Sequence, residues 1–247
     1  MRIPRIHTGQ ALEANGSVEL EAGPGHYITR VLRMRVGDSL ILFNGGGGQY
    51  RATIEAMGKK SVLVATGQFE ALERESDLQL QLGIAMSRGE RMDWVIQKAT
   101  ELGISAVSPL LSERTEVKLK GDRQDKKLKH WQQIATSACE QCGRNRVPPV
   151  HPPQALEQWL AGVQADVKLV LHHRAGTSTQ PATSPRSIAL LVGPEGGLSS
   201  SEITAAESAG FTSLQLGPRV LRTETAPLAA IAILQSRWGD MNEVSAS

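Results

Sequence analysis

Residues 190–238 read LLVGPEGGLSSSEITAAESAGFTSLQLGPRVLRTETAPLAAIAILQSRW, and this stretch contains two glycine-containing loops that each follow an apolar segment. The apolar run Ser187–Val192 predicts a buried strand. The strand is expected to end at residues 193–197, GPEGG, where glycines let backbone N–H groups come close to a ligand. Ser199 and Glu202 have the spacing of a capping box, which predicts a helix directly after Ser199.

A second loop is built in the same way. Residues 214–216 predict a short strand, and Gly217 and Pro218 interrupt it. Thr225 is expected to cap a last helix, which tolerates Pro227 in its first turn and is apolar on most sides. Ligands of open α/β sheets bind where the parallel strands end. The two loops are therefore expected to meet at one edge of a sheet and to form a single binding site.

The composition sets limits on the fold and on the partners. A chain of 247 residues suffices for one large or two modest domains, and with 4% aromatic residues its core must be mainly aliphatic. A net charge of +2 gives no strong indication of a nucleic acid partner. No apolar run has the length of a membrane span, and no apolar segment follows the opening MRIPRIH. A cytoplasmic location without membrane contact is therefore expected.

The chain is expected to contain two domains of different character. Residues 1–70 show short strand patterns around one helical segment, which predicts a small β-barrel, and the charged residues 71–77 predict a linker. Residues 78–247 alternate between strand and helix patterns, which predicts an α/β domain with a parallel sheet. The further expected strands are 17–20, 39–43, 50–56, 61–66, 78–84, 104–110 and 167–171, and the expected helices are 26–33, 88–102, 122–142 and 154–160.

The residues that could bind a metal ion do not form a cluster in the sequence. Cys139 and Cys142 make a single CxxC without the second pair that a zinc site needs. They also lie late in a helical pattern, so we interpret them as structural thiols. His172 and His173 are adjacent and would point to opposite faces of a strand. The sequence therefore predicts that no metal is bound.

Taken together, the two loops resemble the signature of a known enzyme family. GPEGG at 193–197 and LGPRVLRTETA at 216–226 are similar to the motifs of the SPOUT methyltransferases that modify ribosomal RNA. The resemblance extends over nearly the whole chain, including RIPR at residues 2–5. It implies that the sheet of the C-terminal domain carries a deep trefoil knot. It also implies that the preceding domain is PUA-like and binds RNA, and that the enzyme is a homodimer.

The same resemblance implies a cofactor and a reaction. S-adenosylmethionine would bind in the knotted loops, and its methyl group would be transferred to N3 of a uridine in 16S ribosomal RNA. The substrate would be the small-subunit RNA itself or the assembled small ribosomal subunit. Because a base pair hides N3, the target must be unpaired or flipped out. The residues expected at the cofactor are Leu171, His172, Gly193, Pro194, Glu195, Gly196, Leu216, Gly217, Leu221, Thr223, Glu224 and Ala226.

Charged residues of these motifs are the candidates for catalysis. Arg222 would stabilise the anion that develops on the uracil, and Glu195 and Glu224 would hold Arg222 or the cofactor's amine. Glu140 and Arg144 lie on one helical face and would act as base and substrate clamp, with a plain intrahelical ion pair as the alternative. Five arginines would contact RNA; the alternative is that they are ordinary solvated surface residues. These arginines are Arg2, Arg5, Arg30, Arg33 and Arg88.

Three other interpretations remain open at this point. A dinucleotide-dependent oxidoreductase is disfavoured because no G-x-G-x-x-G follows a strand. A non-enzymatic RNA-binding protein would use the barrel and the basic segment 118–129, whose lysines and arginine are otherwise a solvated helix face. A different SPOUT enzyme would act on a ribose or on transfer RNA.

Overall fold

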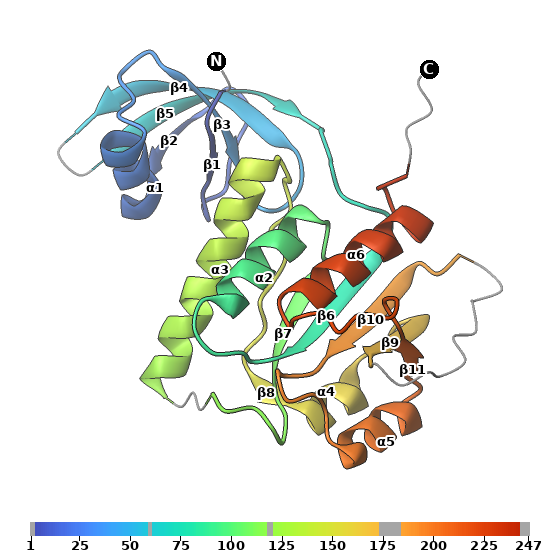
Figure 1. The fold of residues 1–247 in the computed structure, drawn as a ribbon. Helices are drawn as coiled ribbons and strands as arrows, with labels where there is room; N and C mark the ends of the chain where they lie inside the picture. The colour runs from blue at the N-terminus through green and yellow to red at the C-terminus, as the bar shows by residue number, and fades with distance from the viewer. Residues whose placement is uncertain (1–2, 59–60, 118–120, 173–183, 243–247) are drawn as a thin grey trace. The chain divides into compact units, whose positions relative to one another are not determined.

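The computed structural model describes residues 3–58, 61–117, 121–172 and 184–242 (Figure 1). The chain divides into two compact units. The first contains Met1–Glu75 and Cys139–Val147, and the second contains Ser76–Ala138 and Pro148–Ser247. The boundary at residue 75 falls inside the linker that the sequence predicted. The sequence did not predict that a short segment from the middle of the chain returns to the first unit.

The first unit is built on a sheet with the strand order β1-β3-β4-β5-β2. β1 runs parallel to β3, and the other pairings are antiparallel. The pairings among the described residues do not join β1 to β2, so the small barrel that the sequence predicted is an open half-barrel. Its elements are β1 (Arg5–His7), β2 (Ser17–Leu20), α1 (Ala22–His26), the π-helix η1 (Tyr27–Val31), β3 (Ser39–Phe43), β4 (Gln49–Met57) and β5 (Val62–Glu70).

Alternation of apolar and polar side chains explains why these segments form strands. Leu40 and Leu42 of β3 and Ile54 of β4 are buried, and they pack with Val64 of β5 and Ile28 of η1. The residues between them are more exposed, as expected for a sheet with one face in the core. The short strand β1 was not predicted, because three residues that include an arginine and a histidine show no apolar period.

The second unit contains a parallel sheet with the strand order β11-β9-β10-β6-β7-β8. Its strands are β6 (Gln79–Ala85), β7 (Ala106–Leu111), β8 (Gln154–Ala155), β9 (Val167–Leu171), β10 (Ser187–Val192) and β11 (Thr212–Leu214). Its helices are α2 (Arg91–Glu101), α4 (Leu156–Gly162), α5 (Ser200–Ser208), α6 (Thr225–Trp238) and most of α3 (Asp122–Cys142). The α/β class and the bounds of β9 and β10 agree with the sequence prediction.

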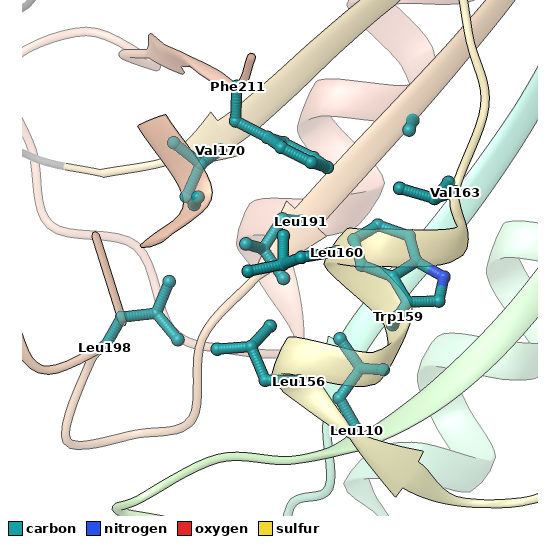
Figure 2. Packing of buried hydrophobic residues seen from close by; sticks show 11 residues of the cluster. Leu110, Leu156, Trp159, Leu160, Val163, Val170, Leu191, Leu198 and Phe211 are labelled. Atoms are coloured by element: carbon teal, nitrogen blue, oxygen red, sulfur yellow. The ribbon is translucent and has the colours of Figure 1, made fainter. Parts of the chain in front are cut away.

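The central strand β10 is buried on both faces, which is why its sequence is apolar without alternation. Ala189 and Leu191 belong to a cluster that includes side chains of α4 and α5 (Figure 2). In this cluster the rings of Trp159 and Phe211 lie 5.7 Å apart between their centroids. A Cβ atom on Gly83 of β6 would overlap the Trp159 ring, so glycine is required there. The other apolar residues of β10, Ile188, Leu190 and Val192, are buried on the opposite face of the sheet, where α6 packs.

Two local predictions near the second loop were wrong in detail. β11 ends at Leu214, so residues 215 and 216 belong to the loop and not to the strand. Helix α6 begins at Thr225, and the N-cap position is Glu224, which makes no side-chain capping bond. The capping box of α5, by contrast, is confirmed with both of its hydrogen bonds, between Ser199 and Glu202. The knot stays an expectation, because strand order alone does not decide how the chain is threaded.

Helix α2 is attached to α3 through the carboxylate of Asp93. This carboxylate accepts hydrogen bonds from Lys127 Nζ at 2.8 Å, His130 Nε2 at 2.7 Å and Trp131 Nε1 at 3.0 Å. Burial acts to raise the pKa of Asp93, but the hydrogen bonds and charges of Lys127 and His130 outweigh it, so the pKa lies below its usual value. A carboxyl with a lowered pKa stabilises the fold above its unfolded pKa and loses this effect as the pH falls through the folded value.

Asp93→Asn is therefore expected to lower the free energy of unfolding by about 1–3 kcal/mol at neutral pH. The difference from the unmodified protein should shrink at about pH 3, below the usual pKa of an aspartate. Urea denaturation at neutral pH and at about pH 3 measures the difference in the free energy of unfolding. Asp125→Asn is the control, because Asp125 lies exposed in the first turn of α3. An Asp93→Asn effect that is the same at both pH values would contradict the charge-based explanation.

Candidate functional site

The carboxyl ends of three neighbouring strands surround a cavity in the second unit. β11, β9 and β10 are adjacent and parallel, so the segments that follow them emerge at the same edge of the sheet. The cavity there has a volume of about 500 Å³. It is lined by the residues after β9, by the GPEGG loop after β10 and by the long loop between β11 and α6. The two loops that the sequence singled out thus meet at one site.

The GPEGG loop owes its shape to its glycines and its proline. The N–H of Gly197 donates to the carbonyl of Pro194 at 2.8 Å, which closes a tight turn. Gly197 has a φ of +69°, a left-handed conformation that side chains other than glycine rarely adopt. A Cβ atom on Gly193 would lie 3.0 Å from both the backbone N and the Cγ of Leu198. Glycine at 193 therefore allows the close approach of Leu198, and glycine at 197 allows the left-handed conformation of the turn.

The start of helix α5 fixes this loop to the neighbouring segment after β7. Glu202 is 5% exposed, and its two carboxylate oxygens accept the N–H groups of Ser199 and Glu113, both at 2.7 Å. From the same segment, Arg114 Nη1 donates to the carbonyl of Gly196 at 2.7 Å. The GPEGG loop is thus held from both sides by hydrogen bonds, which limits its freedom before any ligand binds.

The second loop leaves much of its backbone and several side chains accessible. Gly217 has a φ of +75°, and its carbonyl accepts a hydrogen bond from Gln215 Nε2 at 3.4 Å. Val220 is 91% exposed, which is unusual for an aliphatic side chain. The carbonyl of Arg222 accepts hydrogen bonds from the N–H groups of Thr225 and Ala226, both at 2.9 Å, at the start of α6. The side chain of Arg222 stays exposed.

The structure brings nearly all of the predicted cofactor residues together at this cavity. Of the twelve, Glu224 is the exception, since it lines a neighbouring cleft instead. Sequence reasoning did not single out the other lining residues: some lie within the two motifs, most of the rest lie beside them in the chain, and Arg114 follows β7. The missed residues are Arg114, Val192, Gly197, Leu198, Ser200, Ile203, Leu214, Gln215, Pro218, Arg219 and Val220.

The neighbouring cleft has a volume of about 930 Å³ and lies between the GPEGG loop and the start of α2. Arg91 occupies its wall and contacts both motifs, with Nη1 2.5 Å from Glu195 Oε1 and Nε 3.8 Å from Glu224 Oε2. These two carboxylates were expected to hold Arg222 or the cofactor. In the structure they face Arg91, and Arg222 does not line the cavity or the cleft.

The structure places Glu140 and Arg144 in the first unit, where both have structural partners. Arg144 is 5% exposed, and its Nε and Nη2 donate to the carboxylate of Glu75, with Nη2 2.5 Å from Oε2. Glu140 Oε1 accepts the N–H of His7 at 2.9 Å. Burial raises the pKa of the Glu140 carboxyl, although this hydrogen bond and the charge of Arg5 act in the opposite direction. The intrahelical pair that the spacing allowed is not formed.

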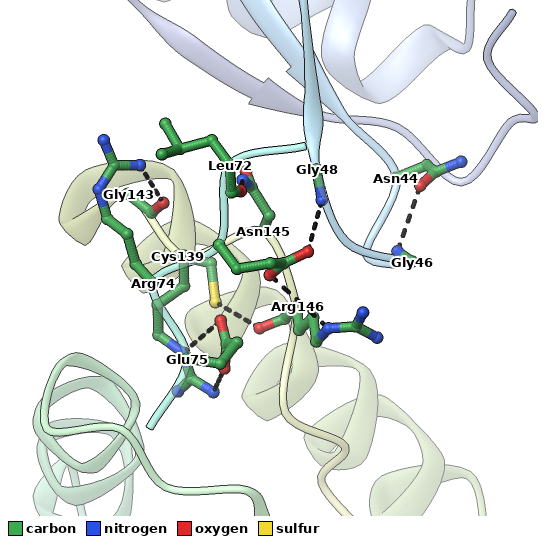
Figure 3. A network of polar contacts seen from close by, with 12 residues as sticks. Asn44, Gly46, Gly48, Leu72, Arg74, Glu75, Cys139, Gly143, Asn145 and Arg146 are labelled. Carbon is green, nitrogen blue, oxygen red and sulfur yellow. Dashed lines mark hydrogen bonds and ion pairs between the residues drawn. The ribbon is translucent and has the colours of Figure 1, made fainter. Parts of the chain in front are cut away.

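A network of polar contacts surrounds these residues and explains why the segment Cys139–Val147 belongs to the first unit (Figure 3). Asn145 is fully buried, donates to the carbonyl of Leu72 and accepts from Arg5 Nη2, both at 2.5 Å. Arg5 Nη1 also donates to Gln49 Oε1 at 2.5 Å. This network ties the segment to β1, β4 and the chain after β5.

The arginines that were expected to contact RNA differ in their exposure and in their partners. Arg5 is 8% exposed and is used inside the first unit, so it is not available to a phosphate, and this expectation was wrong. Arg30 and Arg33 are exposed around the end of η1, and Arg33 has a φ of +52°. Arg88 is exposed in the second unit and forms an ion pair with Glu116 at 2.8 Å. Arg2 lies outside the described residues.

In the part of the chain that the structure describes, the cysteines and the other possible metal ligands indicate no second type of site. Cys139 is buried, and burial raises the pKa of its thiol to about 12, which suits a structural thiol. Among the described residues, no three histidine, cysteine, aspartate or glutamate side chains are grouped as a metal site would require. His173 lies outside the described part. No described helix combines the length and the apolar character that crossing a membrane requires.

Comparison with known proteins identifies the family. Residues 74–235 match the RNA methyltransferase domain, and residues 25–66 match the PUA domain of RNA methyltransferases. Ribosomal RNA small subunit methyltransferase E of Buchnera aphidicola subsp. Acyrthosiphon pisum (strain APS) is 36% identical over 97% of this chain and 95% of its own length. The same-named protein of Bacillus subtilis (strain 168) is 31% identical over 92% and 93%. This chain belongs to the ribosomal RNA small subunit methyltransferase E family.

Solved structures of similar chains carry the same fold. The methyltransferase E of Neisseria gonorrhoeae, bound to S-adenosyl methionine, is 37% identical, with a TM-score of 0.92 and coverage of 98% of this chain and 100% of that one. A methyltransferase of Legionella pneumophila, in complex with the same cofactor, is 40% identical, with a TM-score of 0.92 and coverage of 97% and 100%. The resemblance to methyltransferases of ribosomal RNA that the two loop motifs indicated is confirmed.

Proposed function

We propose that this chain transfers a methyl group from S-adenosylmethionine to N3 of a uridine in small-subunit ribosomal RNA. The observation that carries the proposal is the cavity at the ends of β9, β10 and β11, which both motif loops line. Relatives of the same fold and with more than a third of their residues identical are bound to this cofactor. The alternative of a dinucleotide-dependent oxidoreductase has no such support.

The residues of the cavity fit a nucleoside-like cofactor. Its volume of about 500 Å³ lies in the range of small-molecule sites. Aliphatic side chains such as Leu171, Leu216 and Ile203 can cover the faces of an adenine ring, and the loop backbones offer N–H and carbonyl groups to its edge. Glycine at 193 and 196 leaves space that a side chain would fill. When bound, the cofactor supplies an electrophilic methyl group on a sulfonium.

The protein's own residues must then position the acceptor nitrogen and favour the loss of its proton. Holding the two reactants in line supplies a large part of such a rate enhancement. A cation beside the uracil stabilises the anion that forms when N3 loses its proton. We infer that Arg222 provides this charge, because it lies exposed on the loop that also lines the cavity. Glu140 and Arg144 are better explained as structural residues of the first unit.

Arg222→Ala is expected to slow single-turnover methyl transfer by about 100-fold, the usual cost of removing one group that stabilises a developing charge. Cofactor affinity, measured by calorimetry, should stay unchanged because Arg222 does not line the cavity. Arg222→Lys should keep more of the rate. Arg237→Ala is the matched control, since Arg237 is another exposed arginine in the last turn of α6. Chemistry in Arg222→Ala at the rate of the unmodified enzyme would rule out this role.

Two experiments test the proposed function as a whole. Transfer of a labelled methyl group to small-subunit RNA, compared with assembled small subunits, identifies the substrate. Mass spectrometry of ribosomal RNA from cells that lack this protein should show loss of a single 3-methyluridine. If the lost modification were on a ribose or in transfer RNA, the assignment to uridine N3 would fail while the methyltransferase activity would stand.

The resemblance also supports proposals on assembly and threading. We infer a homodimer and a knotted second unit, because the full length of the chain matches this family. Helix α6 carries Ile233, which is 38% exposed, on an otherwise apolar surface that suits a partner. A monomer in light scattering at micromolar concentration would contradict the dimer.

A further inference from the structure

We propose that the cleft beside the cofactor cavity is the subsite for the extruded target base, and that Trp94 is the surface on which this base stacks. This inference rests on the proposed function and adds the residues that receive the acceptor. Arg222 does not line the cleft, but it lies on the same loop two residues before Glu224, which does, and its exposed side chain would reach the base from that loop. The cleft is lined by Arg88, Gly89, Glu90, Arg91, Trp94, Arg114, Glu116, Glu195, Gly196 and Glu224.

The cleft and the cofactor cavity share a wall. Arg114, Glu195 and Gly196 line both spaces. Arg114 is fixed to this wall through its hydrogen bond to the carbonyl of Gly196. The shared lining residues place a group bound in the cleft next to a group bound in the cavity. Methyl transfer requires such a neighbouring space, because the acceptor must reach the donor without displacing it.

Trp94 has the properties of a stacking surface. Its neighbours on α2, Met92, Val95 and Ile96, are buried, whereas the Trp94 side chain lies on the opposite side of the helix and is 53% exposed. Lys98 Nζ lies 5.3 Å from the centroid of its ring, a cation–π contact that restricts the indole. A large aromatic ring that the fold leaves half open to solvent beside an active site suits a nucleobase, whose faces bind to such rings.

The charges of the cleft distinguish a base from a phosphate backbone. Its three arginines face four glutamates, Glu90, Glu116, Glu195 and Glu224. Arg88 is already paired with Glu116, and Arg91 with Glu195 and Glu224. A channel for phosphates would need an excess of cations. A cleft without an excess of cations suits an uncharged, planar group, and the guanidinium and carboxylate groups around it can bind the polar edge of a pyrimidine.

Trp94→Ala tests the proposal in the full-length enzyme. Stacking of one base on an aromatic side chain predicts a loss of about 5- to 150-fold in kcat/KM for the RNA substrate. Trp94→Phe should recover most of the activity, because it restores an aromatic face. Calorimetry should show unchanged affinity for S-adenosylmethionine in both variants. Gln97→Ala, one turn further along α2 and outside the cleft, is the control and should behave like the unmodified enzyme.

A photochemical readout is independent of turnover. Small-subunit RNA that contains 5-bromouridine should crosslink to Trp94 on irradiation, and peptide mass spectrometry locates the attached residue. Trp94→Ala with unchanged kcat/KM, or a crosslink at another residue, would overturn the inference. So would a loss of activity together with dissociation of a dimer in light scattering, because Trp94 would then contact a second copy. Unmodified enzyme that transfers no methyl group to RNA would instead refute the proposed function, and the crosslink would still test the base contact.

Discussion

Arg144→Ala is expected to lower the free energy of unfolding by about 3–5 kcal/mol, because it leaves the Glu75 carboxylate without its buried partner. Arg144 is 5% exposed, and its guanidinium donates through both Nε and Nη2 to Glu75. The same backbone segment holds Asn145, which bonds to Arg5 and Leu72. A loss of this size is a large part of the stability of an ordinary domain. Urea denaturation followed by circular dichroism measures it.

The matched control is the neighbouring arginine. Arg146 is 56% exposed in its side chain, and its Nε lies 3.7 Å from Glu73 Oε2. Exposed pairs of this kind contribute about 0–1 kcal/mol, so Arg146→Ala should change the stability little. The comparison also separates the structural role of Arg144 from the substrate clamp that the motif suggested. A stable, folded Arg144→Ala enzyme with strongly reduced kcat would restore the clamp.

The position of Arg144 in the structure shows which information a single sequence lacks. The spacing of Glu140 and Arg144 placed both on one helical face, and nothing local revealed that the chain turns after Cys142 and returns to the first unit. Glu75 precedes Arg144 by 69 residues, and Arg5 precedes Asn145 by 140. Such long-range partners leave no pattern in a single sequence. For the same reason Arg5 was taken for an RNA contact, although it is buried.

The cavity at the ends of β9, β10 and β11 could be predicted far better from the sequence, because the features that form it are local. Apolar runs, glycines and a capping box each fix the backbone within a few residues, and parallel strands bring the loops that follow them to one edge. What remained invisible was the contribution of other strands. Arg91 is the first residue of α2 and contacts both motif loops, and Arg114 follows β7 and holds the GPEGG loop. These positions carry no motif, and only the sheet order places them at the site.

The second large effect is expected for Gly196→Trp, which should weaken the binding of S-adenosylmethionine by about 100-fold or more, equivalent to about 2.7 kcal/mol. Gly196 lines both the cavity and the cleft, so an indole at this position has to occupy one of them. The residue is exposed and has no left-handed φ, so the fold itself should tolerate the side chain. Isothermal calorimetry measures the affinity, and circular dichroism verifies the fold.

Gly196→Ala separates the effect of bulk from the effect of losing glycine. A Cβ atom there would lie 3.5 Å from Arg114 Cδ, an ordinary contact, so the alanine variant should bind the cofactor nearly as well as the unmodified enzyme. If alanine and tryptophan weakened binding equally, the backbone conformation would matter and not the free space. If neither did, the cofactor would bind away from the GPEGG loop. Because the acceptor cleft shares this residue, a tryptophan that left cofactor affinity intact but abolished RNA methylation would place the indole in the cleft.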